Sequence, residues 1–160
     1  MKPLRLHMCS RMGNTGSSIA MLAIAAFGLV AAARGADDPA RGAEPLRVVV
    51  HVNFSDSGQQ GRGLENIENI LKAASSAGIR TEVEVVCHAQ GIDLVHRKQS
   101  AHPALVEGLR KQGVRFVACQ NTMRKRSMQK DDLLPGVTTV PSGAFEIVVR
   151  QRDGYSYFKP

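Results

Sequence analysis

The chain has 160 residues, of which 43% are hydrophobic and 22% are charged, a composition typical of one globular domain. Its formal net charge is +7, but four of its 21 basic residues and none of its 14 acidic residues precede residue 37. The other 17 basic residues against 14 acidic residues leave a net charge of only +3. A strongly basic face that binds nucleic acid is therefore not expected.

The sequence pattern of residues 1–36 predicts a signal peptide. Lys2, Arg5 and Arg11 form a basic start, and an uncharged apolar run of 15 residues follows from 19 to 33. This length suits the apolar core of a signal peptide, whereas a membrane-spanning helix needs about 20 residues. Export is therefore expected, with the bacterial periplasm as the location and no permanent membrane anchor, and retention of the segment as an anchor is the alternative. Residues 37–45 predict a flexible linker.

Residues 46–160 are expected to form one domain in which strands and helices alternate. β-Branched runs indicate the strands, and apolar residues at helical spacing between capping residues and glycines indicate the helices. In chain order, the expected elements are a strand at 48–52, a helix from the caps at 55–57 to Gly78, a strand at 83–86, a short helix at 93–97, a helix from Pro103 to Gly113, a strand at 114–118, a helix at 124–129, a strand at 137–140, a helix from Ser142 to Arg152 and a strand at 155–158. Residues 147–149 alone would equally suit a strand.

This alternation predicts a parallel sheet that is covered by helices on both faces. In such folds the ligand binds beyond the carboxyl ends of the strands. The loops that begin there start at Asn53, at Cys87 and His88, at Cys119, and at Pro141.

Cys119 is the leading candidate for chemistry, because it lies between a predicted strand and a predicted helix. The positive end of a helix dipole favours a thiolate, and Arg124 and Lys125 would add positive potential. A thiolate is the form that accepts sulfur or exchanges disulfides. The alternative is that Cys119 only packs, because free cysteines are among the most buried residues.

Five stretches between Arg47 and Pro160 together resemble the DsrE/DsrF-like family. These stretches are residues 48–53, 113–122, 132–137, 140–143 and 154–160. The resemblance implies a three-layer α/β/α sandwich of the flavodoxin or Rossmann type, with a mostly parallel five-stranded sheet, and oligomers built from such subunits. It also implies sulfur relay, with a persulfide on Cys119, which stands where relay members of the family carry theirs.

On this interpretation Cys119 accepts the sulfur, Arg124 and Lys125 stabilise its anion, and Asn121 helps to orient the loop. No cofactor is expected, because sulfur is the cargo. The expected partners are sulfur donors, acceptor thiols or proteins, and further copies of the chain. Two alternatives stay open: a non-catalytic oligomeric module that binds a small ligand, and a thiol–disulfide redox protein.

Cys87, His88 and Asn53 are auxiliary candidates, because they too lie at the ends of predicted strands. A Cys87–Cys119 disulfide is disfavoured if the second and third strands flank the first. Strands two places apart are about 9–10 Å apart, whereas a disulfide needs Cα atoms within about 7 Å. His88 is expected to tune a nearby thiolate if the loops bring the two side chains together.

Neither a metal site nor a nucleotide site is expected. The histidines match no standard spacing of metal ligands. The glycines at 58–63 lack the spacing of a dinucleotide-binding loop, and we interpret them as a flexible loop. The basic run at 122–130 is interpreted as a solvated helix face, and the alternative is a docking site for an acidic partner or an oxyanion.

Overall fold

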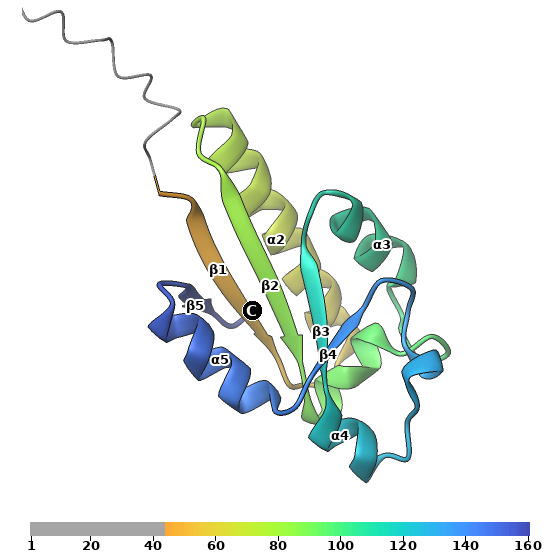
Figure 1. Cartoon of the computed structure of the whole chain (residues 1–160). Coiled ribbons are helices and arrows are strands. Elements are labelled where there is room, and N and C mark those ends of the chain that lie inside the picture. Colours follow the sequence, from red (N-terminus) through yellow and green to blue (C-terminus); the bar gives the residue numbers. More distant parts are fainter. Residues whose placement is uncertain (1–43) are drawn as a thin grey trace, which may run out of the picture. The chain divides into compact units, whose positions relative to one another are not determined.

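The computed structural model describes residues 44–160, so the predicted signal peptide and nearly all of the predicted linker lie outside the described residues. Strands and helices alternate along the described chain (Figure 1). The strands are β1 (Leu46–Val52), β2 (Thr81–Cys87), β3 (Arg115–Cys119), β4 (Thr138–Val140) and β5 (Ser156–Phe158). The α-helices are α2 (Ser57–Ser76), α3 (Pro103–Lys111), α4 (Gln120–Lys125) and α5 (Gly143–Arg152), and the 3-10 helices are η1 (Ala89–Val95) and η2 (Lys130–Asp132).

The five strands form one parallel sheet in the order β4-β3-β2-β1-β5, which confirms the predicted α/β class. The second and third strands do not flank the first, because β2 and β3 are neighbours. Each of the first three crossovers moves the chain one place along the sheet. Only the last crossover returns across it, to place β5 beside β1.

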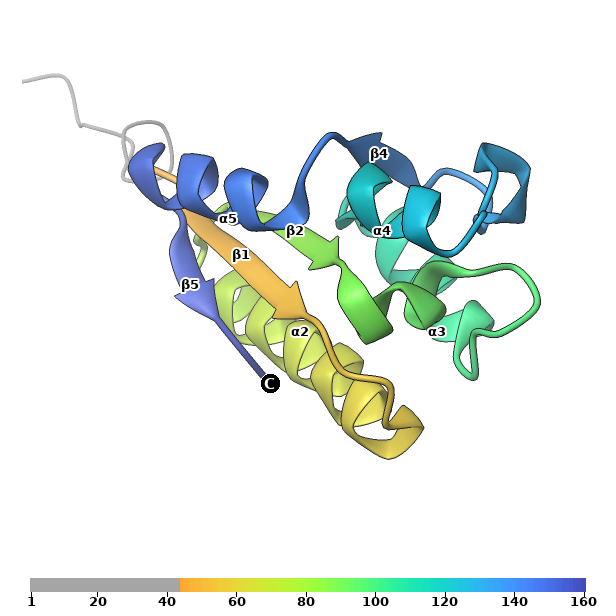
Figure 2. The ribbon, with the colours of Figure 1, turned by 90° about the horizontal axis from the view of Figure 1, so that it is seen from below.

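This return decides which helix covers which face. Strand–helix–strand crossovers are right-handed, so a crossover in the reverse direction places its helix on the opposite face. Figure 2 shows α2 on one side of the sheet and α5 on the other. The larger core lies on the side of α2, where Leu64 and Ile67 pack against Val50 and Val85. The smaller core lies on the side of α5, where Ile147 packs with Val49, Val86, Val117 and Val140.

The helix starts at 56 and 142 follow the predicted caps. The Asp56 side chain accepts a hydrogen bond from the Gln59 N–H, and the Ser142 side chain accepts one from the Phe145 N–H. Residues 147–149 are helical, so the alternative of a strand there is wrong.

The glycines at 58–63 lie inside α2, so the prediction of a flexible loop is wrong. They permit close packing. A Cβ atom on Gly63 would lie 2.9 Å from Cγ of Pro160, and one on Gly61 would lie 3.0 Å from Cε1 of His102. These glycines therefore bring α2 close to the C-terminus and to the start of α3.

Two predicted helices are displaced towards the strand ends. The helix expected at 124–129 is α4, which starts directly after Cys119 and ends at Lys125. Ser127 has a φ angle of 53°, which a right-handed helix does not allow, so the helix cannot reach residue 129. The short helix expected at 93–97 is η1, which starts at Ala89. None of the helices within residues 44–160 is long and apolar enough to cross a membrane.

Candidate functional site

Cys119 ends β3 at a point where two neighbouring strands send their helices to opposite faces of the sheet. The helix after β3 is α4, whose Met123 packs into the larger core. The helix after β4 is α5, whose Ile147 packs into the smaller core. Such a divergence opens a crevice beyond the carboxyl ends of the strands. The sequence order of the elements therefore places Cys119 at a ligand-binding position of the fold.

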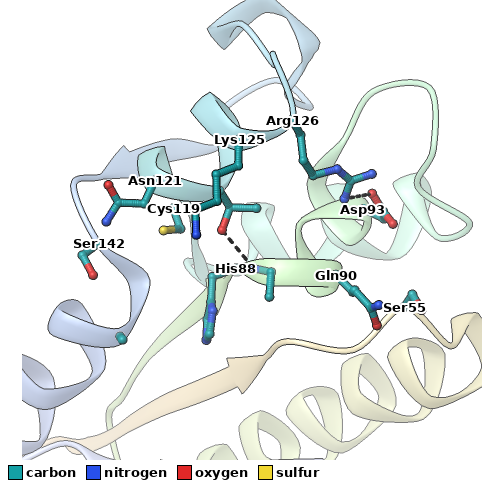
Figure 3. A pocket seen from close by; sticks show the side chains of 12 residues that line it. Ser55, His88, Gln90, Asp93, Cys119, Asn121, Lys125, Arg126 and Ser142 are labelled. Atoms are coloured by element: carbon teal, nitrogen blue, oxygen red, sulfur yellow. Dashed lines mark hydrogen bonds and ion pairs between the residues drawn. The ribbon is translucent and has the colours of Figure 1, made fainter.

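A pocket of about 610 Å³ occupies this crevice. It is lined by Ser55, His88, Ala89, Gln90, Asp93, Cys119, Asn121, Thr122, Lys125, Arg126, Ser142 and Ala144. Figure 3 shows the Cys119 sulfur at one end, near Asn121 and Ser142, and the paired Asp93 and Arg126 at the other end. The pocket thus combines one thiol with polar and cationic side chains.

The Cys119 thiol lies between two helix starts, because it precedes α4 directly and lies against Gly143 at the start of α5. Burial by itself would raise the pKa of the thiol. Hydrogen bonds from the backbone of Gly143, Thr122 and Asn121 and from the Thr122 hydroxyl outweigh burial, and they lower the pKa of Cys119 below its ordinary value. These donors satisfy the negative charge of a thiolate. The geometry therefore favours the reactive form of this cysteine.

Gly143 comes close to Cys119 because it has no side chain. A Cβ atom on Gly143 would lie 3.3 Å from Cβ of Cys119 and 3.0 Å from Cβ of His88. Both distances are shorter than ordinary van der Waals contact, so a larger residue would push the start of α5 away. The glycine thereby lets a backbone N–H reach the sulfur.

Thr122 connects the sulfur to η1. Its Oγ1 accepts a hydrogen bond from the Ala89 N–H at 3.0 Å, which leaves the hydroxyl proton for the sulfur. Ala89 has a φ angle of 50°, an uncommon value for a residue with a side chain. The backbone of η1 is thus held in an unfavourable conformation at the pocket wall, where its N–H orients Thr122.

Cys87 is separated from Cys119 by the sheet itself. It pairs in register with Ala118, so the next residue of β3, Cys119, points to the other face. Cys87 packs in the larger core with no exposed surface, and burial raises the pKa of its thiol. Both cysteines are free. The predicted reason against a disulfide was wrong, because the strands are adjacent, and the actual obstacle is that the two side chains lie on opposite faces.

His88 lies in the pocket wall beside Cys119 and contacts a second histidine. Its Nε2 lies 2.6 Å from Nε2 of His51, and the planes of the two rings are 13° apart. Nδ1 of His51 lies 2.7 Å from the hydroxyl oxygen of Tyr157. Burial, followed by the effect of His88 and Lys159, lowers the pKa of His51 to about 4, and burial together with Lys159 lowers the pKa of His88. Both rings are therefore neutral at pH 7.

The cationic side chains differ in their positions. Lys125 and Arg126 line the pocket, and Arg126 forms an ion pair with Asp93 at 2.6 Å. Arg124 does not line the pocket and instead donates a hydrogen bond to Oδ1 of Asn121. Asn121 is therefore held by Arg124, while Lys125 faces the space in front of the thiol.

Asn53 follows β1 but does not line the pocket, and its backbone instead lies against Gly91 of η1. Within residues 44–160, no group of three or more His, Cys, Asp or Glu side chains is placed to hold a metal ion.

The family model of the DsrE/DsrF-like family matches residues 47–160, which is most of the chain. The chain belongs to the DsrE/DsrF-like family. The chain is also similar to a solved structure, a protein of unknown function from Methanobacterium thermoautotrophicum. The two are 37% identical with a TM-score of 0.67, and the match covers 71% of this chain and 98% of the other. A comparison with curated proteins found no match.

The DsrE/DsrF-like family is associated with sulfur relay, in which its members act with partner proteins. The sequence indicated the cysteine at the end of the third strand but not the groups that tune it. Thr122 and Gly143 stood within the stretches that resemble the family, and no spacing rule assigned them to the sulfur. Thr122 lies near Cys119 because α4 starts directly after this residue, whereas Gly143 meets Cys119 only because the sheet places β3 beside β4.

Proposed function

We propose that this DsrE/DsrF-like protein is a sulfur carrier that holds a persulfide on Cys119. The observation that carries the proposal is the position of Cys119 between the starts of α4 and α5 in the wall of the pocket, where Gly143, Thr122 and Asn121 lower the pKa of its thiol. A nucleophilic cysteine needs an ionised thiol, an approach for its substrate and neighbours that stabilise negative charge. All three requirements favour Cys119 over a purely structural cysteine.

The transfer needs no external oxidant. The Cys119 thiolate attacks the outer sulfur of a donor persulfide, R–S–SH, and a new S–S bond forms to Cys119. The S–S bond of the donor breaks, and its electron pair leaves on R–S⁻, which takes up one proton. Cys119 gave up one proton when it ionised, so the products are the Cys119 persulfide and the thiol R–SH. Attack by an acceptor thiolate on the outer sulfur then regenerates Cys119.

Side chains around the pocket support the same chemistry. The ammonium group of Lys125 faces a space in which a thiolate, a persulfide anion and a leaving thiolate would all carry negative charge. Arg124 acts through Asn121, whose backbone is one of the donors to the sulfur. We therefore assign electrostatic stabilisation to Lys125 and a positioning role to Arg124.

Intact-mass spectrometry after brief exposure to polysulfide tests the proposal. Wild-type protein should gain one sulfur mass, about 32 Da, and a reductant should remove it. Cys119→Ser should gain nothing and remain folded, whereas the matched control Cys87→Ser should load like wild type. Equal loading of Cys119→Ser and wild type would exclude a carrier role for this residue.

A module that binds a small ligand without chemistry is the second candidate, and the pocket volume of about 610 Å³ favours it over the redox alternative. Slow alkylation of Cys119 in native protein, together with no gain of sulfur, would support this reading. A redox cycle between Cys87 and Cys119 is disfavoured, because the two thiols lie on opposite faces of the sheet.

We also propose that copies of the chain associate through α5. Phe145 and Val148 on this helix are 67% and 63% exposed, which is unusual for large apolar side chains. Light scattering should give an oligomer mass for wild type and a monomer mass for Phe145→Lys. Export to the periplasm also belongs to the proposal, and N-terminal sequencing of protein from fractionated cells tests it.

A further inference from the structure

Three side chains beside the pocket form a continuous hydrogen-bonded chain across the sheet. The Tyr157 hydroxyl contacts Nδ1 of His51 at 2.7 Å, and Nε2 of His51 contacts Nε2 of His88 at 2.6 Å. Nδ1 of His88 takes part in no hydrogen bond within residues 44–160, and His88 lines the pocket that contains Cys119. The chain therefore has one end in the pocket and the other at Tyr157, which is 44% exposed.

The sheet places these groups in one row on one face. Tyr157 pairs with Val49, whose side chain lies in the smaller core, so Tyr157 and His51 share that face. His88 lies two residues after Val86, so its side chain points to the same face as that of Val86. In the same way, the side chain of Cys119 points to the same face as that of Val117. The strands β5, β1, β2 and β3 are consecutive neighbours in the sheet. Their residues, or the residue directly after the strand in the case of β2, place Tyr157, His51, His88 and Cys119 on the face that α5 covers.

Each link in this chain holds one proton, and the chain has two orientations. In the first, Tyr157 donates to His51, His51 Nε2–H donates to His88, and the N–H of His88 is at Nδ1. In the second, both hydrogen bonds are reversed, and Nδ1 of His88 is unprotonated. Both imidazoles stay neutral in both orientations, because each ring has one N–H and one acceptor nitrogen.

We propose that Tyr157, His51 and His88 form a relay that carries one proton at a time between solvent and the Cys119 pocket. The identity of the group that it serves rests on the proposed function. When Cys119 ionises and its proton leaves into the pocket, Nδ1 of His88 takes up one proton there, Nε2–H of His88 passes to His51, and Nδ1–H of His51 passes to Tyr157, which releases its own proton to water. When R–S⁻ leaves the donor, the same steps run inward and protonate it.

The charges around the chain suit this role. Burial has the largest effect on His51, and His88 and the cationic Lys159, which face it together with the Tyr157 hydroxyl, add to that effect. Together they disfavour an imidazolium ion on either ring, so a proton that enters one end displaces a proton from the other end. A permanently charged histidine pair would block such a chain.

Nitrogen-15 spectra of the imidazole rings test the connection without any sulfur chemistry. Tyr157→Phe keeps the aromatic ring but removes the hydroxyl, and it should shift the ring-nitrogen resonances of His88, which Tyr157 does not touch. Tyr155→Phe is the matched control, since the Tyr155 hydroxyl donates to Glu82 at 3.2 Å, and it should leave them unchanged. If Tyr157→Phe shifts only the ring-nitrogen resonances of His51 and not those of His88, the relay is disproved. His51→Gln provides a second break in the chain and should give the same shift at His88.

The rate of sulfur loading from polysulfide tests the use of the relay. General acid–base groups contribute about 10²–10⁴ in rate, and a relay behind such a group contributes less, so Tyr157→Phe should load about tenfold more slowly. Its solvent isotope effect should also change, while Tyr155→Phe should match wild type. Loading of Tyr157→Phe at the wild-type rate, with the same isotope effect, would overturn the relay. If wild type takes up no sulfur but Tyr157→Phe still shifts His88, the carrier function fails and the relay stands.

Discussion

Cys87 and Cys119 end two neighbouring strands, yet the sheet gives them opposite chemical environments. Cys87 has no exposed surface and packs among the apolar side chains of the larger core, where burial raises the pKa of its thiol. Cys119 is one residue further along in register and faces the helix starts of α4 and α5, whose donors lower the pKa of its thiol. The face of the sheet, and not the residue type or the strand end, therefore decides which thiol has a lowered pKa.

The largest expected effect is the difference in alkylation rate between the Cys119 and Cys87 thiols in native protein. Iodoacetamide at pH 7 should alkylate Cys119 at least about 100-fold faster than Cys87, because each unit of difference in pKa changes the thiolate fraction up to tenfold and Cys87 is also sealed from solvent. Peptide mapping of labelled protein measures both rates. Cys87 should react only after unfolding, and comparable native rates would refute the contrast.

Gly143→Ala should reduce the difference in pKa and in alkylation rate between Cys119 and Cys87. The added methyl group would contact Cys119 and His88, displace the start of α5 and remove its N–H from the sulfur. The pKa of Cys119 should rise, and the alkylation rate at pH 7 should fall about tenfold, because a smaller fraction of the thiol is ionised. Gly108→Ala in α3 is the matched control, because a Cβ atom there meets nothing within 4 Å. Identical alkylation profiles for the two variants would contradict this role of Gly143.

Thr122→Val should have a smaller effect in the same direction. The change removes one hydroxyl donor to Cys119 and leaves the backbone donors in place, so alkylation should slow about threefold at pH 7, within the usual value of a single hydrogen bond. Thr122→Ser keeps the hydroxyl and should restore most of the rate. A rate-against-pH series for the three proteins measures the shift, and equal losses in both variants would point to packing instead.

The last expected effect is on stability, and it arises on the face that carries Cys119. The pKa of His51 is about 4 in the folded chain against 6.5 for a free side chain, so the unfolded chain binds more protons between these values. The free energy of unfolding should therefore decrease as the pH falls from 6.5 to about 4. Urea unfolding across this range measures it, and His51→Gln should flatten the dependence. An unchanged slope in that variant would show that other groups cause it.

Much of the fold could be predicted because its signals are local. β-Branched runs mark the strands, and Ser142 marks the start of α5. The helix expected at 124–129 starts at Gln120 instead, and the positive φ of Ser127 prevents it from reaching residue 129. The glycines of α2 were wrongly predicted to form a loop, because their packing partners, His102 and Pro160, are distant in sequence.

The sequence by itself determined the alternation of strands and helices, the family, and the cysteine that stands at the end of the third strand. Only the tertiary structure decided that β2 lies beside β3, that Cys87 and Cys119 point to opposite faces, and that Tyr157, His51 and His88 meet. The periodicity of apolar residues depends on neighbours a few residues apart, so it can be recognised in the sequence. The pKa of Cys119 depends on Gly143, which becomes a neighbour only when the sheet is assembled.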